Sequence, residues 1–312
     1  AQLTLSNLAS ALLRGVLGAA GAEIERRHGR FDLPAPGGKA GSATPPNMAV
    51  IAYGTLGACE LGYGSDLDIV FLFEQERPLS DGKRPLAPEQ YYARLAQRVL
   101  SFLTVMTPSG RLYEVDTRLR PNGRAGSLVS SIEAFRDYQM NQAWTWEQQA
   151  LSRARFVSGS PSLEAAFNRV RLDALCRERK ESELAADLSE MRQKMASGQE
   201  SKSRADPEAS AKHRPGGLID IEFVAQLGVL ASARLYPRVI RATGTETQLA
   251  ELAAIGWLSR DEAEQLQTTM AGLREQKLMA ALIGKQGLVD IDTHKAAEIC
   301  TRKLGIEPPI SE

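Results

Sequence analysis

The segment "GYGSDLDIVF" (62–71) places two carboxylates, Asp66 and Asp68, one residue apart at the start of an apolar run. Aspartate is a poor strand former and is costly in apolar surroundings, so a strand that begins with two of them requires an explanation. Alternate residues of a strand share a face, which puts both carboxylates on one side. The apolar residues point to the other side: Leu67, Ile69, Phe71 and Phe73. This pattern predicts a half-buried strand whose polar face meets water or a ligand.

A third aspartate, Asp116, lies in "GRLYEVDTRLRP" (110–121), which alternates and ends at a proline. We interpret this segment as another strand. One face would carry Glu114, Asp116, Arg118 and Arg120. Two neighbouring strands would then bring three aspartates together with arginines beside them.

Three clustered carboxylates repel one another unless a cation lies among them. Oxygen ligands of this kind suit Mg²⁺, which is held by one or two carboxylates plus substrate phosphates. Two such ions, ~3.5–4 Å apart, clamp the attacking and leaving oxygens of a phosphoryl displacement. We therefore predict Asp66, Asp68 and Asp116 as metal ligands and catalytic residues.

The turn before these acids, Gly62 to Ser65, offers backbone N–H groups that could cradle a triphosphate. Arg118 and Arg120 would add positive charge where a leaving pyrophosphate forms. Other readings stay open, because an Asp-x-Asp pair at a strand start is common without catalysis. The arginines could equally be structural partners of the acids, and Glu114 is best assigned to a salt bridge.

The elements expected to position these residues are a helix, a Pro- and Gly-rich loop, strands and a second helix. They are predicted at 5–28 (helix, stopped by Gly29), 33–47 (loop), 48–53 and 65–74 (strands), and 87–106 (helix). A capping box of Ser130 and Glu133 opens a helix predicted over 130–157, after which strand signals disappear. The polar segment 196–217 is expected to be disordered or an active-site loop. We predict an α/β domain at 1–155 and a helical bundle at 156–312.

Composition excludes several classes of protein. At 312 residues the chain is long enough for two cores, and 38 basic against 38 acidic residues argues against a nucleic-acid partner. No secretory signal or membrane-spanning apolar stretch is evident, and Cys59, Cys176 and Cys300 are far apart, so we expect a cytoplasmic protein without a zinc site or disulfide. The missing initial methionine suggests a fragment.

Gly-Ser, Asp-x-Asp and a later strand aspartate together resemble the polymerase-β-type nucleotidyltransferase superfamily. Four motifs in order are closer still to the bacterial glutamine synthetase adenylyltransferase family, from about residue 48 to 235. They are "VIAYGTLGACELGYGSDLDIVFLFE", "LYEVDTRLRP", "DYQMNQAWTWEQQALSRARFVSG" and "GGLIDIEFVAQ". The resemblance implies an α+β fold: a polymerase-β-like nucleotidyltransferase domain with a small mixed sheet, followed by an all-helical bundle.

The family carries two such units, one that removes AMP from a glutamine synthetase tyrosine by phosphorolysis and one that attaches AMP from ATP. "NQAWTWEQQAL" above all resembles the attaching unit. The resemblance therefore implies ATP and Mg²⁺ as substrate and cofactor, glutamine synthetase as protein substrate, and the PII signal protein as regulator. It makes Asp66 and Asp68 metal ligands, Asp116 the acid that also orients the phenol oxygen, and Gly64 and Ser65 the phosphate-binding turn.

Alternatives remain: the phosphorolytic unit, a tRNA end-adding nucleotidyltransferase, or a catalytically silent module that binds nucleotide or PII. Thr55, where the family usually has lysine, favours the silent module.

Several residues are assigned no catalytic role. Asp220 and Glu222 lie two apart on a predicted helix and so point in different directions, with Glu222 slightly favoured to reach a nucleotide. Trp144 and Trp146 are predicted to pack within the helix, and residues 171–194 to form one solvated helical face. The three histidines, His28, His213 and His294, are expected to be solvated.

Overall fold

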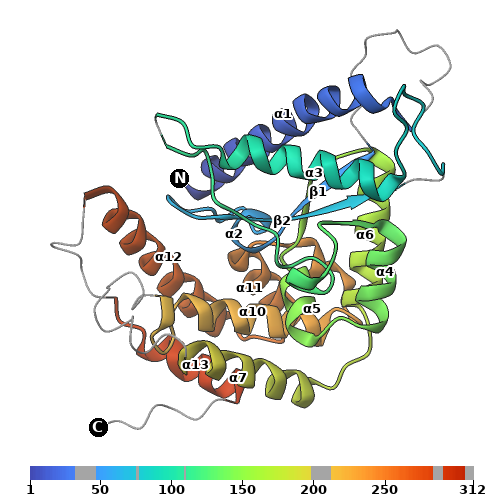
Figure 1. Cartoon of the computed structure of the whole chain (residues 1–312). Helices are drawn as coiled ribbons and strands as arrows, with labels where there is room; N and C mark the ends of the chain where they lie inside the picture. The colour runs from blue at the N-terminus through green and yellow to red at the C-terminus, as the bar shows by residue number, and fades with distance from the viewer. Residues whose placement is uncertain (32–46, 75–76, 109, 198–211, 284–290, 306–312) are drawn as a thin grey trace. The chain divides into compact units, whose positions relative to one another are not determined.

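The computed structural model describes residues 1–31, 47–74, 77–108, 110–197, 212–283 and 291–305 (Figure 1). The chain divides into two compact units, which we describe separately. The sheet unit comprises residues 1–143 and 153–173, and the helical unit comprises 144–152 and 174–312. This division follows contacts, so the domain boundary at residue 155 stays a prediction. The loop at 33–46 and most of the polar segment 196–217 lie outside the described residues.

The sheet unit contains, among its described residues, a five-stranded mixed sheet in the order β3-β2-β1-β5, with β4 also paired to β2. Its strands are β1 (Met48–Ala52), β2 (Leu67–Phe73), β3 (Val115–Asp116), β4 (Val129–Ser131) and β5 (Arg155–Ser158). Strand β1 is antiparallel to β2 and β5, whereas β2 is parallel to β3 and β4. The predicted small mixed sheet is confirmed.

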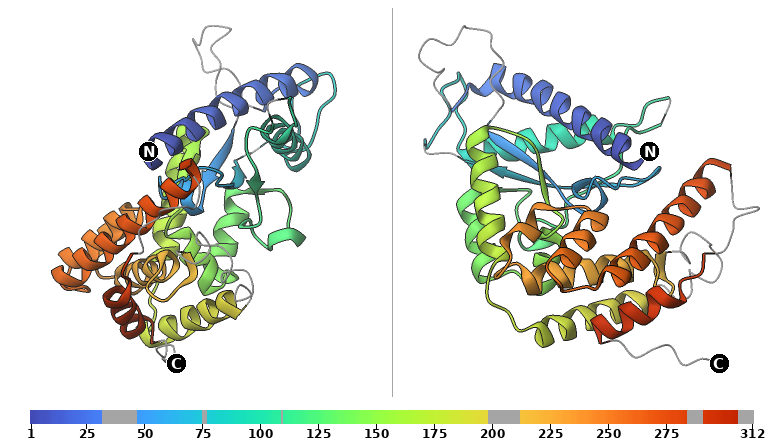
Figure 2. Two further views of the ribbon diagram at one scale, coloured as in Figure 1. Left: turned by 90° about the vertical axis from the view of Figure 1, so that its left-hand side faces the viewer. Right: turned by 180° about the vertical axis from the view of Figure 1, so that it is seen from behind.

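Two long helices, α1 (Gln2–His28) and α3 (Pro88–Thr104), lie side by side over the sheet (Figures 1 and 2). The alternating apolar residues of β2 enter one hydrophobic core with Leu13 and Leu17 of α1 and Leu95 and Val99 of α3. The predicted burial of the apolar face of β2 is therefore confirmed. Helix α1 ends as expected at Gly29, whose φ of 75° is accessible to glycine.

Helix α1 is long and apolar enough, by length and composition alone, to cross a membrane. No such segment was expected from the sequence. The buried residues of α1 contribute to the sheet-unit core, which is the behaviour of a core helix.

Two strand and helix predictions are wrong in extent. Only Val115 and Asp116 of the segment 110–121 form a strand, because the chain turns after Asp116 into the loop that leads to β4. The helix predicted over 130–157 is broken into α4 (Ile132–Asn141), α5 (Thr145–Leu151) and strand β5. The alternating end of that segment pairs with β1, and pairing with a sheet edge overrides helical propensity. Ser131, not Ser130, caps α4 by accepting from the Ala134 N–H at 3.1 Å.

Residues 171–194 are not one helix either. They span the end of α6 (Pro161–Leu175) and most of α7 (Glu181–Ser197). Arg179 stabilises the break by donating to the carbonyls of Ala174 and Leu175 at 2.7 and 2.8 Å. A short helix, α2 (Gly54–Gly57), connects β1 to the glycine-rich turn before β2.

The helical unit packs around α10 (Leu218–Ser232), nearly all of whose residues are buried. An evenly apolar helix of this kind needs neighbours on every side. They are α5, α7, α11 (Thr245–Ala254), α12 (Arg260–Ile283), α13 (His294–Leu304) and the 3₁₀ turn Pro237–Arg241. The expected helical C-terminal region is confirmed.

Candidate active site

The carboxylates of Asp68 and Asp116 lie side by side because β2 and β3 pair in parallel. Leu67 is in register with Val115 and Asp68 with Asp116. The Leu67 N–H donates to the Glu114 carbonyl at 2.9 Å, and the Asp68 carbonyl accepts from the Tyr53 N–H at 2.8 Å. Backbone bonds of Asp68 and of its neighbour Leu67 thus tie the start of β2 to the segments on both sides of it. The structure brings these two predicted acids together.

Asp66 precedes β2 and is exposed, so it is held less firmly than Asp68. It lies near enough to Asp68 for its charge to raise the pKa of that residue. The three predicted acids therefore form one region of negative potential.

The carboxyl of Asp68 resists ionisation. Burial raises its pKa to about 6, with further increases from the charges of Asp116 and Asp66. Arg118 and Arg153 act in the opposite direction but do not offset these effects. A carboxylate destabilised by burial and by like charges is a group that a cation would stabilise.

Gly54 is a determinant of the site that the sequence analysis missed. A Cβ at this position would lie 2.2 Å from Asp68 Oδ2, and its φ of +54° disfavours other residues. The close approach of the Asp68 carboxylate to the start of α2 thus depends on this glycine. The "YGTLG" run was visible in the sequence, but only the approach of Asp68 shows why its first glycine matters.

Asp116 is held by Arg118. The Arg118 N–H donates to Oδ1 at 2.8 Å and its Nε to Oδ2 at 2.6 Å, and the two side chains form an ion pair. The side-chain hydrogen bond from Arg118 is the main reason that the pKa of Asp116 is lowered. The Arg118 side chain is 60% exposed and can therefore reach a ligand only by leaving or sharing this carboxylate.

The side chain of Arg120 is hydrogen-bonded to the loop that follows β3. Its guanidinium donates to Thr117 O at 2.8 Å, Thr117 Oγ1 at 2.9 Å and Gly126 O at 3.2 Å. The alternation that placed Arg120 on the face of Asp116 ends with the strand. The structure therefore brings Arg118 to the carboxylates and engages Arg120 with loop 117–126.

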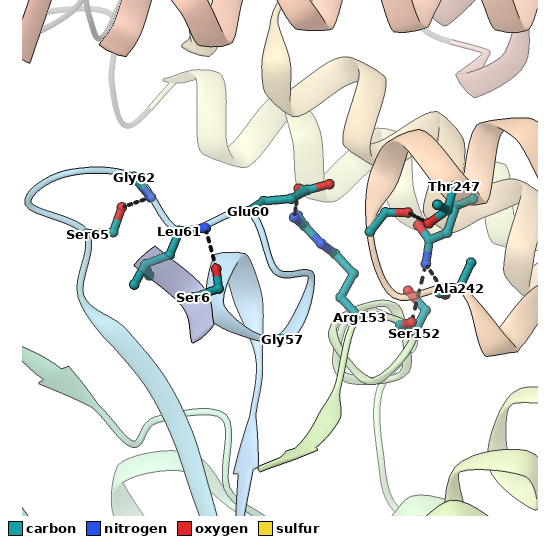
Figure 3. Close-up of polar contacts among 12 residues, drawn as sticks. Ser6, Gly57, Glu60, Leu61, Gly62, Ser65, Ser152, Arg153, Ala242 and Thr247 are labelled. Carbon is teal, nitrogen blue, oxygen red and sulfur yellow. Dashed lines mark hydrogen bonds and ion pairs between the residues drawn. The ribbon is translucent and has the colours of Figure 1, made fainter. Parts of the chain in front are cut away.

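The predicted phosphate-binding turn closes on itself (Figure 3). The Gly62 N–H donates to Ser65 Oγ at 3.2 Å, and the Ser65 N–H donates to Gly62 O at 3.3 Å. Gly64 has a φ of +69°, which only glycine adopts readily. The conformation of the turn therefore depends on both Gly64 and Ser65.

The donor chemistry of this region fits Mg²⁺ in part. Within the described part of the chain, no group of three His, Cys, Asp or Glu side chains is arranged as a ready metal cage. Mg²⁺ does not require one, because it is usually held by one or two carboxylates together with substrate phosphates. Asp68 and Asp116 supply two such carboxylates in register, and the turn at Gly62–Ser65 lies next in sequence.

Several residues that were assigned no catalytic role have a different environment from the one predicted. His28 is not solvated: it is buried, and its Nδ1 is 2.8 Å from Arg84 O. Trp144 and Trp146 do not pack inside a helix, since they are 70% and 38% exposed. His294 is exposed as expected.

Asp220, in the helical unit, is a structural residue. It is buried in an ion pair with Arg192 and accepts from the Gly216 N–H at 2.8 Å. The prediction that Asp220 and Glu222 point in different directions agrees with their burial, since Glu222 is partly exposed. The three cysteines form no disulfide, as predicted.

A mixed sheet that carries in-register carboxylates after a Gly-Ser turn is the arrangement that the sequence motifs led us to expect of a nucleotidyltransferase. Residues 2–170 match the family "Glutamate-ammonia ligase adenylyltransferase", and residues 184–283 match "GlnD PII-uridylyltransferase". The chain belongs to the glutamate-ammonia ligase adenylyltransferase family.

Curated relatives carry the name bifunctional glutamine synthetase adenylyltransferase/adenylyl-removing enzyme. The protein of Methylococcus capsulatus is 40% identical over 311 residues, covering 98% of this chain and 32% of the relative. That of Xanthomonas campestris pv. campestris (strain B100) is 41% identical over 299 residues, covering 95% and 30%. That of Stenotrophomonas maltophilia (strain R551-3) is 41% identical over 280 residues, covering 89% and 29%. The chain therefore spans about a third of the length of these relatives.

Proposed function

We propose that this chain transfers AMP from ATP to a tyrosine hydroxyl of glutamine synthetase and releases pyrophosphate. The observation that carries the proposal is the in-register pair Asp68 and Asp116, which follows a Gly-Ser turn closed by its own hydrogen bonds. The names of the relatives support the protein substrate. The motif "NQAWTWEQQAL" supports the attaching direction.

In the proposed step the tyrosine oxygen attacks the α-phosphorus of ATP. A new O–P bond forms, the bond between the α-phosphorus and the bridging oxygen breaks, and pyrophosphate leaves with the electron pair. The phenol proton passes to Asp116 or to water. Asp116 orients the attacking oxygen, and the backbone N–H groups of Tyr63 and Gly64, inside the Gly62–Ser65 turn, bind the triphosphate.

Asp66, Asp68 and Asp116 are the residues that would hold Mg²⁺. When bound, Mg²⁺ supplies positive charge to the phosphate oxygens and to the leaving group. Arg118 adds charge at the same place. Arg120 acts in this proposal through the shape of loop 117–126, because its donors bind that loop.

The reverse-direction activity is the second candidate, since the relatives' names include adenylyl removal. There an oxygen of inorganic phosphate would attack the phosphorus of AMP-tyrosine, and the tyrosine would leave as ADP forms. Thr55, where the family usually has lysine, keeps a third reading open, a silent module that binds nucleotide or PII. We further propose regulation by PII and a cytoplasmic location.

The test uses the chain with glutamine synthetase, Mg²⁺ and ATP labelled at the α-phosphate. We expect label on the synthetase tyrosine with wild-type chain, and its loss with Asp116→Asn. Asp261→Asn is the matched control, because it makes the same change at an exposed position in the first turn of α12.

A parallel reaction supplies AMP-modified glutamine synthetase and inorganic phosphate. Formation of ADP there, without incorporation from ATP, would reverse the proposed direction. No product in either reaction would leave the silent module as the better account.

A further inference from the structure

A buried ion pair lies just before the phosphate-binding turn and takes no direct part in the transfer proposed above, although the charge of Arg153 also lowers the pKa of Asp68. Arg153 Nη2 donates to Glu60 Oε2 at 2.6 Å, and their side chains are only 5% and 8% exposed (Figure 3). Glu60 is two residues before Gly62, where the turn begins, and Arg153 lies just before strand β5. The pair therefore joins two segments of the sheet unit that are far apart in sequence.

The segment that carries Glu60 needs such support because its backbone is strained. Cys59 has a φ of 60°, a left-handed conformation that is unfavourable for a residue other than glycine. The next two residues are each held: the Glu60 N–H donates to Thr55 O at 2.8 Å, and the Leu61 N–H donates to Ser6 Oγ at 3.1 Å (Figure 3). The direction in which the chain enters the turn is thus set by contacts on both sides of Glu60.

The segment around Arg153 is fitted closely against the same region. A Cβ at Gly57 would lie 2.3 Å from Arg153 O, so the backbones meet without room for a side chain. Two residues on, Arg155 donates to Leu56 O at 3.1 Å and to Gly57 O at 3.3 Å. Arg155 therefore binds the end of α2, and Arg153 binds Glu60, which leads into the turn.

We propose that Glu60 and Arg153 are positioning residues that fix the Gly62–Ser65 turn in the orientation that binds the triphosphate. The inference rests on the proposed function for the identity of the ligand. Removing one partner leaves a buried charge without its counterion, which the segment can relieve only by moving. Displacement of binding groups by about 1 Å can cost about 100-fold. The triphosphate should be affected first, because the turn binds it and the acids that handle the tyrosine are held by β2 and β3.

The test measures binding of α,β-methylene-ATP in Mg²⁺ by calorimetry to the full chain and its variants. We expect Glu60→Gln and Arg153→Met to raise Kd about 30-fold each. The double variant should raise it no more than either single variant, because the two residues act as one unit. Arg153→Lys keeps the charge and should raise Kd about fivefold, which preserves the comparison if a harsher variant fails to fold.

Asp220→Asn is the control matched for burial. It breaks an ion pair of similar exposure, Arg192–Asp220, in the helical unit. It should lower stability and leave Kd for α,β-methylene-ATP within about twofold. In turnover, Glu60→Gln should raise KM for ATP while KM for glutamine synthetase stays unchanged.

A purely structural pair would overturn the proposal. In that case the Glu60 and Arg153 variants would melt at lower temperature but bind α,β-methylene-ATP as tightly as the wild type. Additive losses in the double variant would also overturn it. The binding measurement needs no AMP transfer, so failure of the proposed function alone leaves this outcome readable.

Discussion

Two acidic motifs with the same spacing have different surroundings in the folded chain. "GYGSDLD" carries Asp66 and Asp68 in the sheet unit, and "GGLIDIE" carries Asp220 and Glu222 in the helical unit. In the first, Asp68 meets a second carboxylate, Asp116, across a pair of strands. In the second, Asp220 is buried against a guanidinium and a backbone N–H. Spacing alone does not define a site.

The secondary structure around each motif explains the difference. A strand gathers alternate side chains on one face, so acids from two strands accumulate there. A helix sends residues two apart in different directions, so one acid is buried and the other is not. The sheet motif is left with excess negative charge, and the helix motif is neutralised within the protein. Only the first motif has the excess negative charge that the proposed cation site requires.

The largest expected contrast is in activity. Asp68→Asn should lower the rate of AMP transfer to glutamine synthetase by about 1000-fold, since it removes charge where charge develops in the reaction. Asp220→Asn should leave the rate per folded molecule within about threefold, because it lies in a structural ion pair. Initial rates with labelled ATP, corrected for folded protein, test this. A large loss of AMP-transfer activity in Asp220→Asn would contradict the proposed difference between the two motifs.

The second contrast is in stability. Asp220→Asn should reduce the free energy of unfolding of the helical unit by about 3–5 kcal/mol, because it leaves buried Arg192 without its counterion. Urea unfolding followed by circular dichroism measures this loss. An unchanged midpoint would show that the ion pair contributes nothing.

Asp68→Asn should raise the free energy of unfolding, whereas Asp220→Asn lowers it. The folded-state pKa of Asp68 is raised to about 6 from 3.8, so the folded state binds the proton more tightly than the unfolded state. Stability from this group is fully present below the unfolded pKa and is lost as pH rises through about 6. Removing the charge should therefore stabilise the chain by about 2–3 kcal/mol at pH 8 in metal-free buffer, and not at pH 4.

Urea midpoints of wild type and Asp68→Asn at the two pH values provide the check. Asp116→Asn serves as the contrast, because the pKa of Asp116 is lowered by Arg118 and its charge is stabilising at neutral pH. Loss of the Asp116 charge should therefore lower the free energy of unfolding at pH 8. Equal shifts in both variants would contradict the assigned environments.

The smallest effect is expected at Glu222. This partly exposed side chain should tolerate Glu222→Gln with a change of about 0.5 kcal/mol in unfolding free energy and no measurable change in AMP transfer. A clear loss of activity would restore the weak sequence-based preference for Glu222 as a nucleotide contact.

Local periodicity predicted the central parts of the fold. The apolar face of β2, the helix α3 with Pro88 in its first turn, and the meeting of Asp68 with Asp116 all follow from alternation and helical spacing. The register itself was not predictable, because it depends on backbone pairing between segments almost 50 residues apart.

Other features depend on contacts that local pattern does not encode. Arg120 leaves the predicted face because the chain turns after two strand residues, and β5 forms because β1 offers it an edge. The close approach of Gly54 to Asp68 and the ion pair of Glu60 with Arg153 are visible only in the folded structure. The exposure of Trp144 likewise reflects a helix break that periodicity did not show.

The central claim is that Asp68 and Asp116 jointly hold the cation that accompanies ATP, and Mn²⁺ can report on this in place of Mg²⁺. Electron paramagnetic resonance would count Mn²⁺ bound to the chain in the presence of α,β-methylene-ATP. We predict binding in wild type and Asp220→Asn, and loss of about 100-fold in affinity in both Asp68→Asn and Asp116→Asn. Equal Mn²⁺ affinity in all four proteins would contradict the account.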